Sequence, residues 1–315
     1  MKIFASALAL AVLPALSLLP GAASAQDKPT WAFPVTDKEQ PAVVANTAPR
    51  SAPGSSRQYT RAQADNMFDI PDWFPQMYPK LPKVIANGNA PNVRACGSCH
   101  LPVGAGHDES AYVAGLPAAY FIRQMNDYRS GARKGSGSMQ LIGQHITDAE
   151  IREAADYFAS LKPPKWARVV ETDTVPKTYI AQGNKRLLHP AGGTEPIGNR
   201  IITVPEDEEI VLYRDPRKGF VSYVPKGALA KGAALVAGGD GKTVNCAICH
   251  GVDLKGIADI PPIAGRTATY TVRQLFMIKS GERAGPQAAL MKQAVANLGI
   301  DDMLNIAAYA ASLDP

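Results

Sequence analysis

Residues 96–100 have the sequence Cys96-Gly97-Ser98-Cys99-His100, and the pattern returns as Cys246-Ala247-Ile248-Cys249-His250. The chain has four cysteines, so the two motifs contain all of them. A Cys-x-x-Cys-His run is typical of c-type haem attachment. Its two thiols face the same way at the start of a helix and can bond the two vinyl groups of one haem, while the histidine ligates the iron. The repeated motif predicts two covalently bound haem c groups.

Paired cysteines also have other uses. The two pairs together could hold one zinc ion, or each pair could form a redox dithiol or a disulfide. None of these alternatives needs a histidine directly after the second cysteine, and none explains why that histidine occurs twice. We therefore expect haem attachment at Cys96, Cys99 and His100, and again at Cys246, Cys249 and His250.

The length, composition and net charge of the chain are ordinary for a globular protein. Its 315 residues are enough for about two domains, 46% of them are hydrophobic, and the formal charge is +5. A basic run interleaved with aromatic residues, as nucleic-acid binding would require, does not occur. No nucleic-acid partner is therefore expected.

The first 25 residues have the pattern of a secretory signal peptide. Lys2 supplies the positive charge, residues 4–19 are apolar, and small residues precede a cleavage site after Ala25. A retained membrane anchor is the alternative, but the apolar stretch is short and Pro14 interrupts it. The sequence thus predicts a periplasmic mature chain without a membrane span, which leaves docking to a membrane complex open.

The two motifs begin 150 residues apart, and the same offset holds for the residues that follow them. The matched positions are Gly106 and Gly256, Ala114-Gly115 and Ala264-Gly265, Tyr120 and Tyr270, Arg123-Gln124 and Arg273-Gln274, Ser130-Gly131 and Ser280-Gly281, and Arg133 and Arg283. Two extra residues then enter the second copy, after which Met139 matches Met291 and Tyr157 matches Tyr309. A repeat of this length predicts a duplicated domain.

Each copy has the apolar spacing of helices. In the first copy we expect helices over residues 82–86, 120–130 and 148–161, and in the second over 226–236, 270–280 and 301–313. These set the predicted domains at residues 83–162 and 226–315. Each is small for a protein core alone, and a covalently held haem would supply the missing apolar mass. The predicted class is mainly α.

Two segments fall outside the repeat. Residues 26–82 form a Pro-rich arm, whose stretch 68–79 places aromatic residues between prolines; we expect it to lie extended on the first haem domain, with a partner-docking surface as the alternative. Residues 163–225 form a connector with β-prone runs at 178–180, 200–204 and 209–213. Its acidic cluster, residues 206–209, is either a solvated turn or a docking site for a basic partner.

A histidine below the iron leaves a sixth position to fill. Methionine is a soft ligand that raises the reduction potential, whereas a second histidine lowers it. Met139 and Met291 correspond in the repeat and lie in stretches predicted as loops before the closing helices, so we expect them to be the sixth ligands. Met125 and Met277 lie in predicted helices and are expected to fill the core. His145, six residues past Met139, is the rival ligand.

Groups around the ligands are less distinctive. A proximal histidine normally donates its second N–H to a carbonyl, and we expect that carbonyl at Pro262 and at the matching Tyr112. Arg133 and Arg283 are either partners of haem propionates or surface arginines.

Together these residues resemble the class I cytochromes c, and in particular the tandem di-haem kind typified by cytochrome c4. The second half follows the family order through 245–251, 262–266, 270–275, 281–283, Met291 and 307–313. The first half departs from it at Leu101, where the family often has Gly, and lacks the Pro before Ala114. The resemblance covers residues 83–162 and 226–315, and neither the arm nor the connector.

The resemblance implies two helical haem domains that pass single electrons between redox proteins in the periplasm, as a carrier or as the cytochrome subunit of a dehydrogenase or oxidase, and not an enzyme. Di-haem peroxidases also carry two such motifs, but they need a vacant or replaceable sixth position. Sulfur-oxidising cytochromes use an unusual sixth ligand, for which no spare cysteine exists. A docking module with structural haems is the third alternative.

Overall fold

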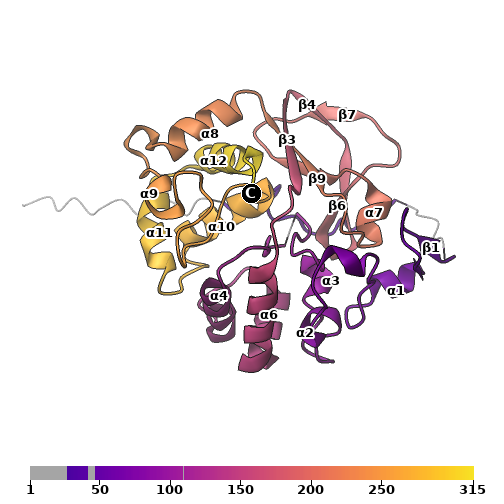
Figure 1. The fold of residues 1–315 in the computed structure, drawn as a ribbon. Coiled ribbons are helices and arrows are strands. Elements are labelled where there is room, and N and C mark those ends of the chain that lie inside the picture. The colour runs from indigo at the N-terminus through magenta and orange to yellow at the C-terminus, as the bar shows by residue number, and fades with distance from the viewer. Residues whose placement is uncertain (1–26, 42–46, 109) are drawn as a thin grey trace, which may run out of the picture.

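A computed structural model describes residues 27–41, 47–108 and 110–315. The predicted signal peptide lies outside the described residues. The described chain is mainly helical, as the sequence predicts, and its strands are short (Figure 1). The first copy (purple to magenta) and the second copy (orange to yellow) lie side by side, with the connector packed on the cores of both.

The described residues of the first copy form five helices. They are α2 (Lys83–Ala86), α3 (Gly97–His100), α4 (Ala118–Ser130), α5 (Gly137–His145) and α6 (Asp148–Ser160). Helix α4 ends at Gly131, whose φ of 77° is a left-handed conformation that favours glycine. Helix α6 begins with a capping box, in which Thr147 and Glu150 satisfy each other's backbone N–H groups. Its apolar residues at helical spacing, among them Ile151 and Phe158, are fully buried.

The second copy repeats this order. Its helices are α8 (Ala228–Val236), α9 (Ala247–His250), α10 (Ala268–Ser280), α11 (Ala288–Val295) and α12 (Ile300–Ser312), with a 3₁₀ turn η3 (Gly239–Gly241) after α8. Helix α10 ends at Gly281, the repeat partner of Gly131, with φ of 82°. Helix α12 crosses α8 and α10 and buries Met303 and Leu304 completely. Each copy thus has its own apolar core.

The connector contains the main β-structure. Strands β3 (Ala167–Thr172), β9 (Phe220–Pro225) and β8 (Ile202–Pro205) form a sheet in that order, with β3 parallel and β8 antiparallel to β9. Two antiparallel pairs accompany it: β4 (Thr174–Pro176) with β7 (Thr194–Pro196), and β5 (Thr178–Ala181) with β6 (Lys185–Leu188), joined by the 3₁₀ turn η2 (Gln182–Asn184).

One β-prone run of the connector is helical instead. The prediction of a strand at residues 209–213 was wrong, because residues 208–212 form helix α7 (Glu208–Leu212). Glu208 and Glu209 stand in its first turn, where carboxylates interact favourably with the positive end of the helix dipole. Asp207 also accepts a hydrogen bond from the backbone N of Glu209, at 3.1 Å. The acidic cluster therefore forms the start of a helix. The β-prone apolar residues that follow the cluster did not indicate this helix.

The arm is less extended than its prolines suggest. It contains β1 (Arg50–Ser51) paired with β2 (Gln58–Tyr59), helix α1 (Arg61–Asp65) and the 3₁₀ turn η1 (Pro75–Met77). Ile70 donates its backbone N–H to Ala86 of the first copy, at 3.1 Å. Trp73 instead packs in a cluster with Tyr213 of the connector and donates its indole N–H to that residue's carbonyl, at 2.8 Å. The arm therefore joins the first copy to the connector.

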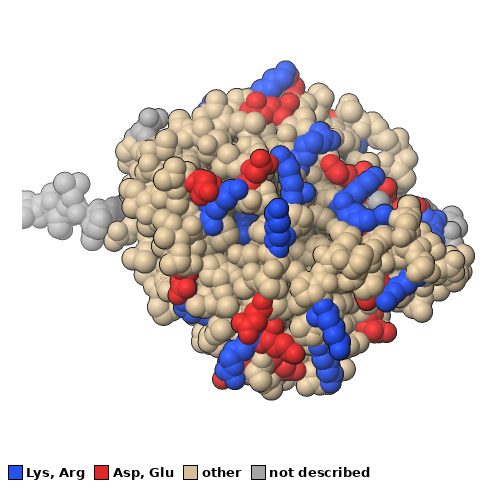
Figure 2. All heavy atoms as spheres, in the orientation of Figure 1, with Lys and Arg blue, Asp and Glu red and all other residues tan. Residues whose placement is uncertain are grey.

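Charged side chains are mixed on the visible surface. Lys and Arg lie among Asp and Glu over the face shown in Figure 2. This face therefore presents no extended field of one sign.

Candidate haem sites

Each Cys-x-x-Cys-His motif folds as a single helical turn, α3 in the first copy and α9 in the second. The backbone N of His100 donates to the carbonyl of Cys96 at 2.9 Å, and that of His250 donates to Cys246 at the same distance. The turn places both thiols and the imidazole on one short segment. Within the described residues, all four cysteines are free thiols.

The environment of the thiols is unlike that of a reactive dithiol. Burial raises the pKa of the Cys96 thiol to about 12 and also raises the pKa of Cys246. A redox dithiol reacts through the thiolate form, which such burial disfavours. In the part of the chain that the structure describes, His, Cys, Asp and Glu residues nowhere gather in groups of three that could hold a metal ion. Both observations weigh against the zinc and dithiol alternatives.

The motif histidines are held in the same way in both copies. His100 Nδ1 lies 2.8 Å from the carbonyl oxygen of Ala111, and His250 Nδ1 lies 2.8 Å from that of Pro261. A carbonyl can only accept, so Nδ1 carries the proton and Nε2 is left for a metal. Burial lowers the pKa of both imidazoles, which favours the neutral form that binds metals. These features fit a haem iron ligand.

The accepting carbonyls correct one expectation. They belong to the residues just before Tyr112 and Pro262, eleven positions after each histidine. The loop between is closed identically in both copies, by hydrogen bonds from Gly106 N to His100 O and from Gly256 N to His250 O. Backbone geometry therefore selects the carbonyl, which the side-chain pattern could not indicate.

Met139 and Met291 lie in helices, α5 and α11, and the prediction of loops at these positions was wrong. The hydroxyl of Ser136 caps α5 by accepting from the backbone N of Met139, at 3.3 Å. Each methionine is half-buried against the core of its own copy, the same core that packs against Cys96 or Cys246. Each predicted sixth ligand therefore packs against the same apolar core as the first cysteine of its motif.

The rival side chains are placed elsewhere. Met125 and Met277 are 4% and 3% exposed and fill the interior. His145 is exposed at the end of α5, and its ring nitrogen lies 2.9 Å from the carbonyl of Leu141 in the same helix. It has the surroundings of a surface histidine.

The predicted propionate arginines lie where the two copies meet. Arg133 is 4% exposed, so the surface interpretation was wrong for it. Its guanidinium donates to the side-chain oxygens of Gln124 and Gln274, at 2.8 and 2.9 Å. Together with Arg283, Tyr120 and Tyr270 these groups form a cluster, here called the Arg–Tyr–Gln cluster. Tyr120, Tyr270 and the glutamines were visible as repeated positions, but repetition alone did not indicate that they meet.

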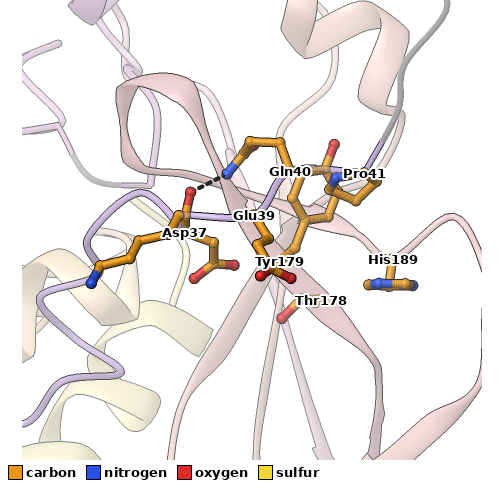
Figure 3. Close-up of a pocket in the computed structure, with 8 residues that line it drawn as sticks. Asp37, Glu39, Gln40, Pro41, Thr178, Tyr179 and His189 are labelled. Carbon is orange, nitrogen blue, oxygen red and sulfur yellow. Dashed lines mark hydrogen bonds between the residues drawn. The ribbon is translucent and has the colours of Figure 1, made fainter.

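An open hollow of about 630 Å³ lies between the arm and the connector (Figure 3). The ring of His189 lies edge-on to Tyr179, with centroids 6.3 Å apart, and the side chain of Gln40 donates to the carbonyl of Asp37 at 2.7 Å. None of the predicted site residues lines this hollow. It is separate from the motif sites.

Comparison with known proteins places the second motif in a family. The Cytochrome c family model matches residues 229–314. Cytochrome c-554(548) of Halomonas halodenitrificans is 39% identical over 81 residues, which are 25% of this chain and 98% of the relative. The thiosulfate dehydrogenase electron acceptor of Stutzerimonas stutzeri is 23% identical over 235 residues, 73% of this chain and 85% of the relative. Cytochrome c4 of Azotobacter vinelandii is 26% identical over 148 residues, 39% of this chain and 70% of the relative.

Two of these relatives are cytochromes by name and one is an electron acceptor by name. The second and third of them match stretches longer than one copy. Helices long and apolar enough to cross a membrane were not found among the described residues. The matched residues include the second motif, whose cysteines and histidine have the geometry described above. The chain belongs to the cytochrome c family, as a cytochrome c4-like protein that binds haem c covalently and transfers electrons.

Proposed function

We propose that this chain is a periplasmic di-haem cytochrome that carries single electrons between two redox proteins. The observation that carries the proposal is the duplicated ligand arrangement. In both copies the motif histidine is held by a carbonyl eleven residues later, at the same 2.8 Å. In both, a methionine packs on the core beside its motif. This equivalence supports one haem in each copy.

The roles of the residues follow from their chemistry. A bound haem supplies a one-electron ferrous–ferric couple. The cysteines, Cys96 and Cys99 in the first copy and Cys246 and Cys249 in the second, anchor it through thioether bonds. His100 and His250 present Nε2 with a fixed ring orientation. Met139 and Met291 supply sulfur, and methionine ligation raises the potential relative to histidine.

The contact between the copies supports a relay. The Arg–Tyr–Gln cluster joins α4 and α10 with hydrogen bonds of 2.6 to 3.0 Å. Such a network holds the two copies in one orientation, because each guanidinium has several fixed acceptors. A constant separation between two redox centres is what repeated electron transfer between them requires.

The electron donor we propose is a dehydrogenase. A relative that aligns over 73% of this chain is named as the electron acceptor of thiosulfate dehydrogenase. Its 23% identity supports the type of partner and leaves the donor's substrate to experiment. A terminal oxidase or another carrier would then take the electrons.

The test is a haem count on the mature protein with optical spectra of both oxidation states. Two haems per chain, both low-spin and both with the ferric absorption band of methionine sulfur ligation, are expected. Neither should bind carbon monoxide or react with peroxide. One high-spin haem that reacts with peroxide would replace the carrier with a di-haem peroxidase. A single haem per chain would exclude the relay.

A further inference from the structure

The two motif turns differ sharply in how they are covered. Ser98 of the first motif is 1% exposed, whereas the matching Ile248 of the second is 73% exposed. Two residues past the histidine, Pro102 is buried and the matching Val252 is 97% exposed. Both motifs belong to the same chain and structure. The difference in their exposure therefore comes from the protein segments that surround each motif.

The arm and the connector cover the first motif. The carbonyl of Met67 in the arm accepts the backbone N–H of Ala95, directly before the first cysteine, at 2.9 Å. Ile70 packs so tightly on the motif that a Cβ at Gly97 would lie 2.5 Å from its Cδ1. Trp166, at the start of the connector, donates its indole N–H to Gly106 at 2.7 Å. Solvent is therefore excluded from this side of the first copy.

This cover brings two cationic side chains to the first motif. Arg214 is 6% exposed and donates to the carbonyl of Asn66 at 2.8 Å, while its Nη2 lies 3.2 Å from the sulfur of Met67. Its Nε is buried without a hydrogen-bond partner among the described residues. Lys185, the first residue of β6, is half-buried. Arg214 thus touches the same arm residue, Met67, that bonds to the backbone next to Cys96.

The electrostatic neighbours of these cations confirm where they lie. Burial lowers the pKa of Lys185 and of Arg214, and the carboxylate of Asp65 and the Cys99 thiol both act in the opposite direction. Burial, and then the charges of Lys185 and Arg214, lower the pKa of His107 to about 3. Both cations therefore lie near the first motif, and Arg214 is connected to it through Met67.

The matching region of the second copy has different chemistry. Ile257 occupies the position of His107 and is 51% exposed. The second cysteine, Cys249, is exposed. The loop that follows carries Asp253, Lys255 and Asp259, all exposed, and Asp259 pairs with Arg123 at 3.0 Å. This side is therefore open to water, whereas the carboxylate of the first-copy loop, Asp108, is 5% exposed.

Oxidation of a haem adds one positive charge to its iron centre. Cations and a low dielectric both disfavour the oxidised form, because the added charge is repelled and poorly solvated. We propose that Lys185 and Arg214, under the cover of the arm and the connector, hold the haem of the first copy at the higher of the two reduction potentials. This inference rests on the proposed binding of two haems. It makes the open second copy the entry point and the covered first copy the destination of an electron.

The order of the potentials can be measured without disturbing the cations. A potentiometric titration of the mature protein should resolve two one-electron waves. Met139→His and Met291→His each lower the wave of their own haem, because histidine ligation lowers the potential, and so identify the waves. The inference requires that Met139→His displaces the higher wave. If it displaces the lower wave, the inference is wrong, although two haems still support the proposed function.

The contribution of the charge is tested by Lys185→Met. At the effective dielectric of a protein, one unit charge about 10 Å away changes a reduction equilibrium roughly tenfold, or about 59 mV for a one-electron couple. The reduction potential of the first-copy haem should fall by about this amount, and that of the second-copy haem should not change. Lys177→Met removes an exposed lysine of the same connector and should move neither wave. Lys185→Gln repeats the charge loss with a polar side chain.

If the reduction potential of the first-copy haem is the same in the wild type and in both Lys185 variants, the proposed role of this charge is wrong. A haem count below two, in contrast, would overturn the proposed function itself. The two failures are therefore distinguishable in the same samples.

Discussion

Arg133 and Arg283 make matching hydrogen bonds in opposite directions across the two copies. Arg133 donates to the hydroxyl of Tyr270 at 2.8 Å, and Arg283 donates to the hydroxyl of Tyr120 at 2.6 Å. The backbone makes the same kind of reciprocal contact. Lys134 N donates a hydrogen bond to Glu282 O, and Ala284 N donates one to Ala132 O, both at 2.7 Å. Equivalent positions thus contact each other, as in an isologous interface. The duplicated halves pack as two subunits of a symmetric dimer would.

This exchange makes Arg133 important for stability. Arg133→Met should lower the free energy of unfolding by about 2–4 kcal/mol, because it removes charged hydrogen bonds and leaves buried acceptors unpaired. Thermal and denaturant unfolding measure the loss. Arg152→Met, at an exposed position on α6, should change stability by less than about 0.5 kcal/mol. Equal effects of the two variants would show that the cluster does not hold the copies together.

The sixth ligands can be tested by spectrum. Met139→Ala and Met291→Ala should each remove half of the ferric methionine–sulfur band and open one haem to carbon monoxide, because alanine has no ligand atom. Met277→Leu is the control: this methionine is 3% exposed in the core, and a volume-conserving substitution should leave the band intact. An unchanged band in Met139→Ala would point to another ligand in the first copy.

His107 should make the protein sensitive to acid. Its pKa is lowered from 6.5 to about 3, chiefly by burial. Below pH 6.5 the unfolded chain therefore takes up a proton that the folded chain does not, and the free energy of unfolding falls as the pH drops toward 3. The slope is at most about 1.4 kcal/mol per pH unit. Denaturant unfolding at several pH values should show a shallower acid slope in His107→Gln, which stays neutral; identical slopes would contradict the burial of this imidazole.

The start of the described arm is attached to the second copy. The rings of Phe33 and Phe276 pack edge to face, with centroids 5.6 Å apart, and Lys28 lies 4.6 Å from the Phe33 ring centre. Phe33→Ala should cost about 1–2 kcal/mol of stability, because the contact is aromatic but only half-buried. Val35→Ala removes a side chain at a position that is 77% exposed and should be nearly neutral. Limited proteolysis should cleave the arm faster in Phe33→Ala than in Val35→Ala. Equal cleavage rates in the two variants would show that Phe33 does not attach the arm to the second copy.

Local patterns in the sequence were sufficient for the helical class and the repeat. The helices α4 and α10, with glycine at each C-terminal end, follow directly from apolar spacing and the conformational preference of glycine. The candidate ligands were also visible, because cysteines and histidine in one motif are neighbours in sequence. These features depend on interactions over a few residues.

Features that depend on distant segments were not visible. The carbonyls that hold His100 and His250 are chosen by loop geometry, because any residue offers a carbonyl. The run at 209–213 became a helix because its acidic start caps it, against its β-propensity.

The sequence by itself determined that this chain carries two equivalent haem motifs, since covalent attachment is encoded in five consecutive residues. Only the tertiary structure decided that the two sites are unequal. The arm and the connector, which lie outside the repeat, fold over the motif at Cys99 and leave that at Cys249 open. Burial and nearby charge, which control a redox centre, arise from segments far apart along the chain and so follow from packing.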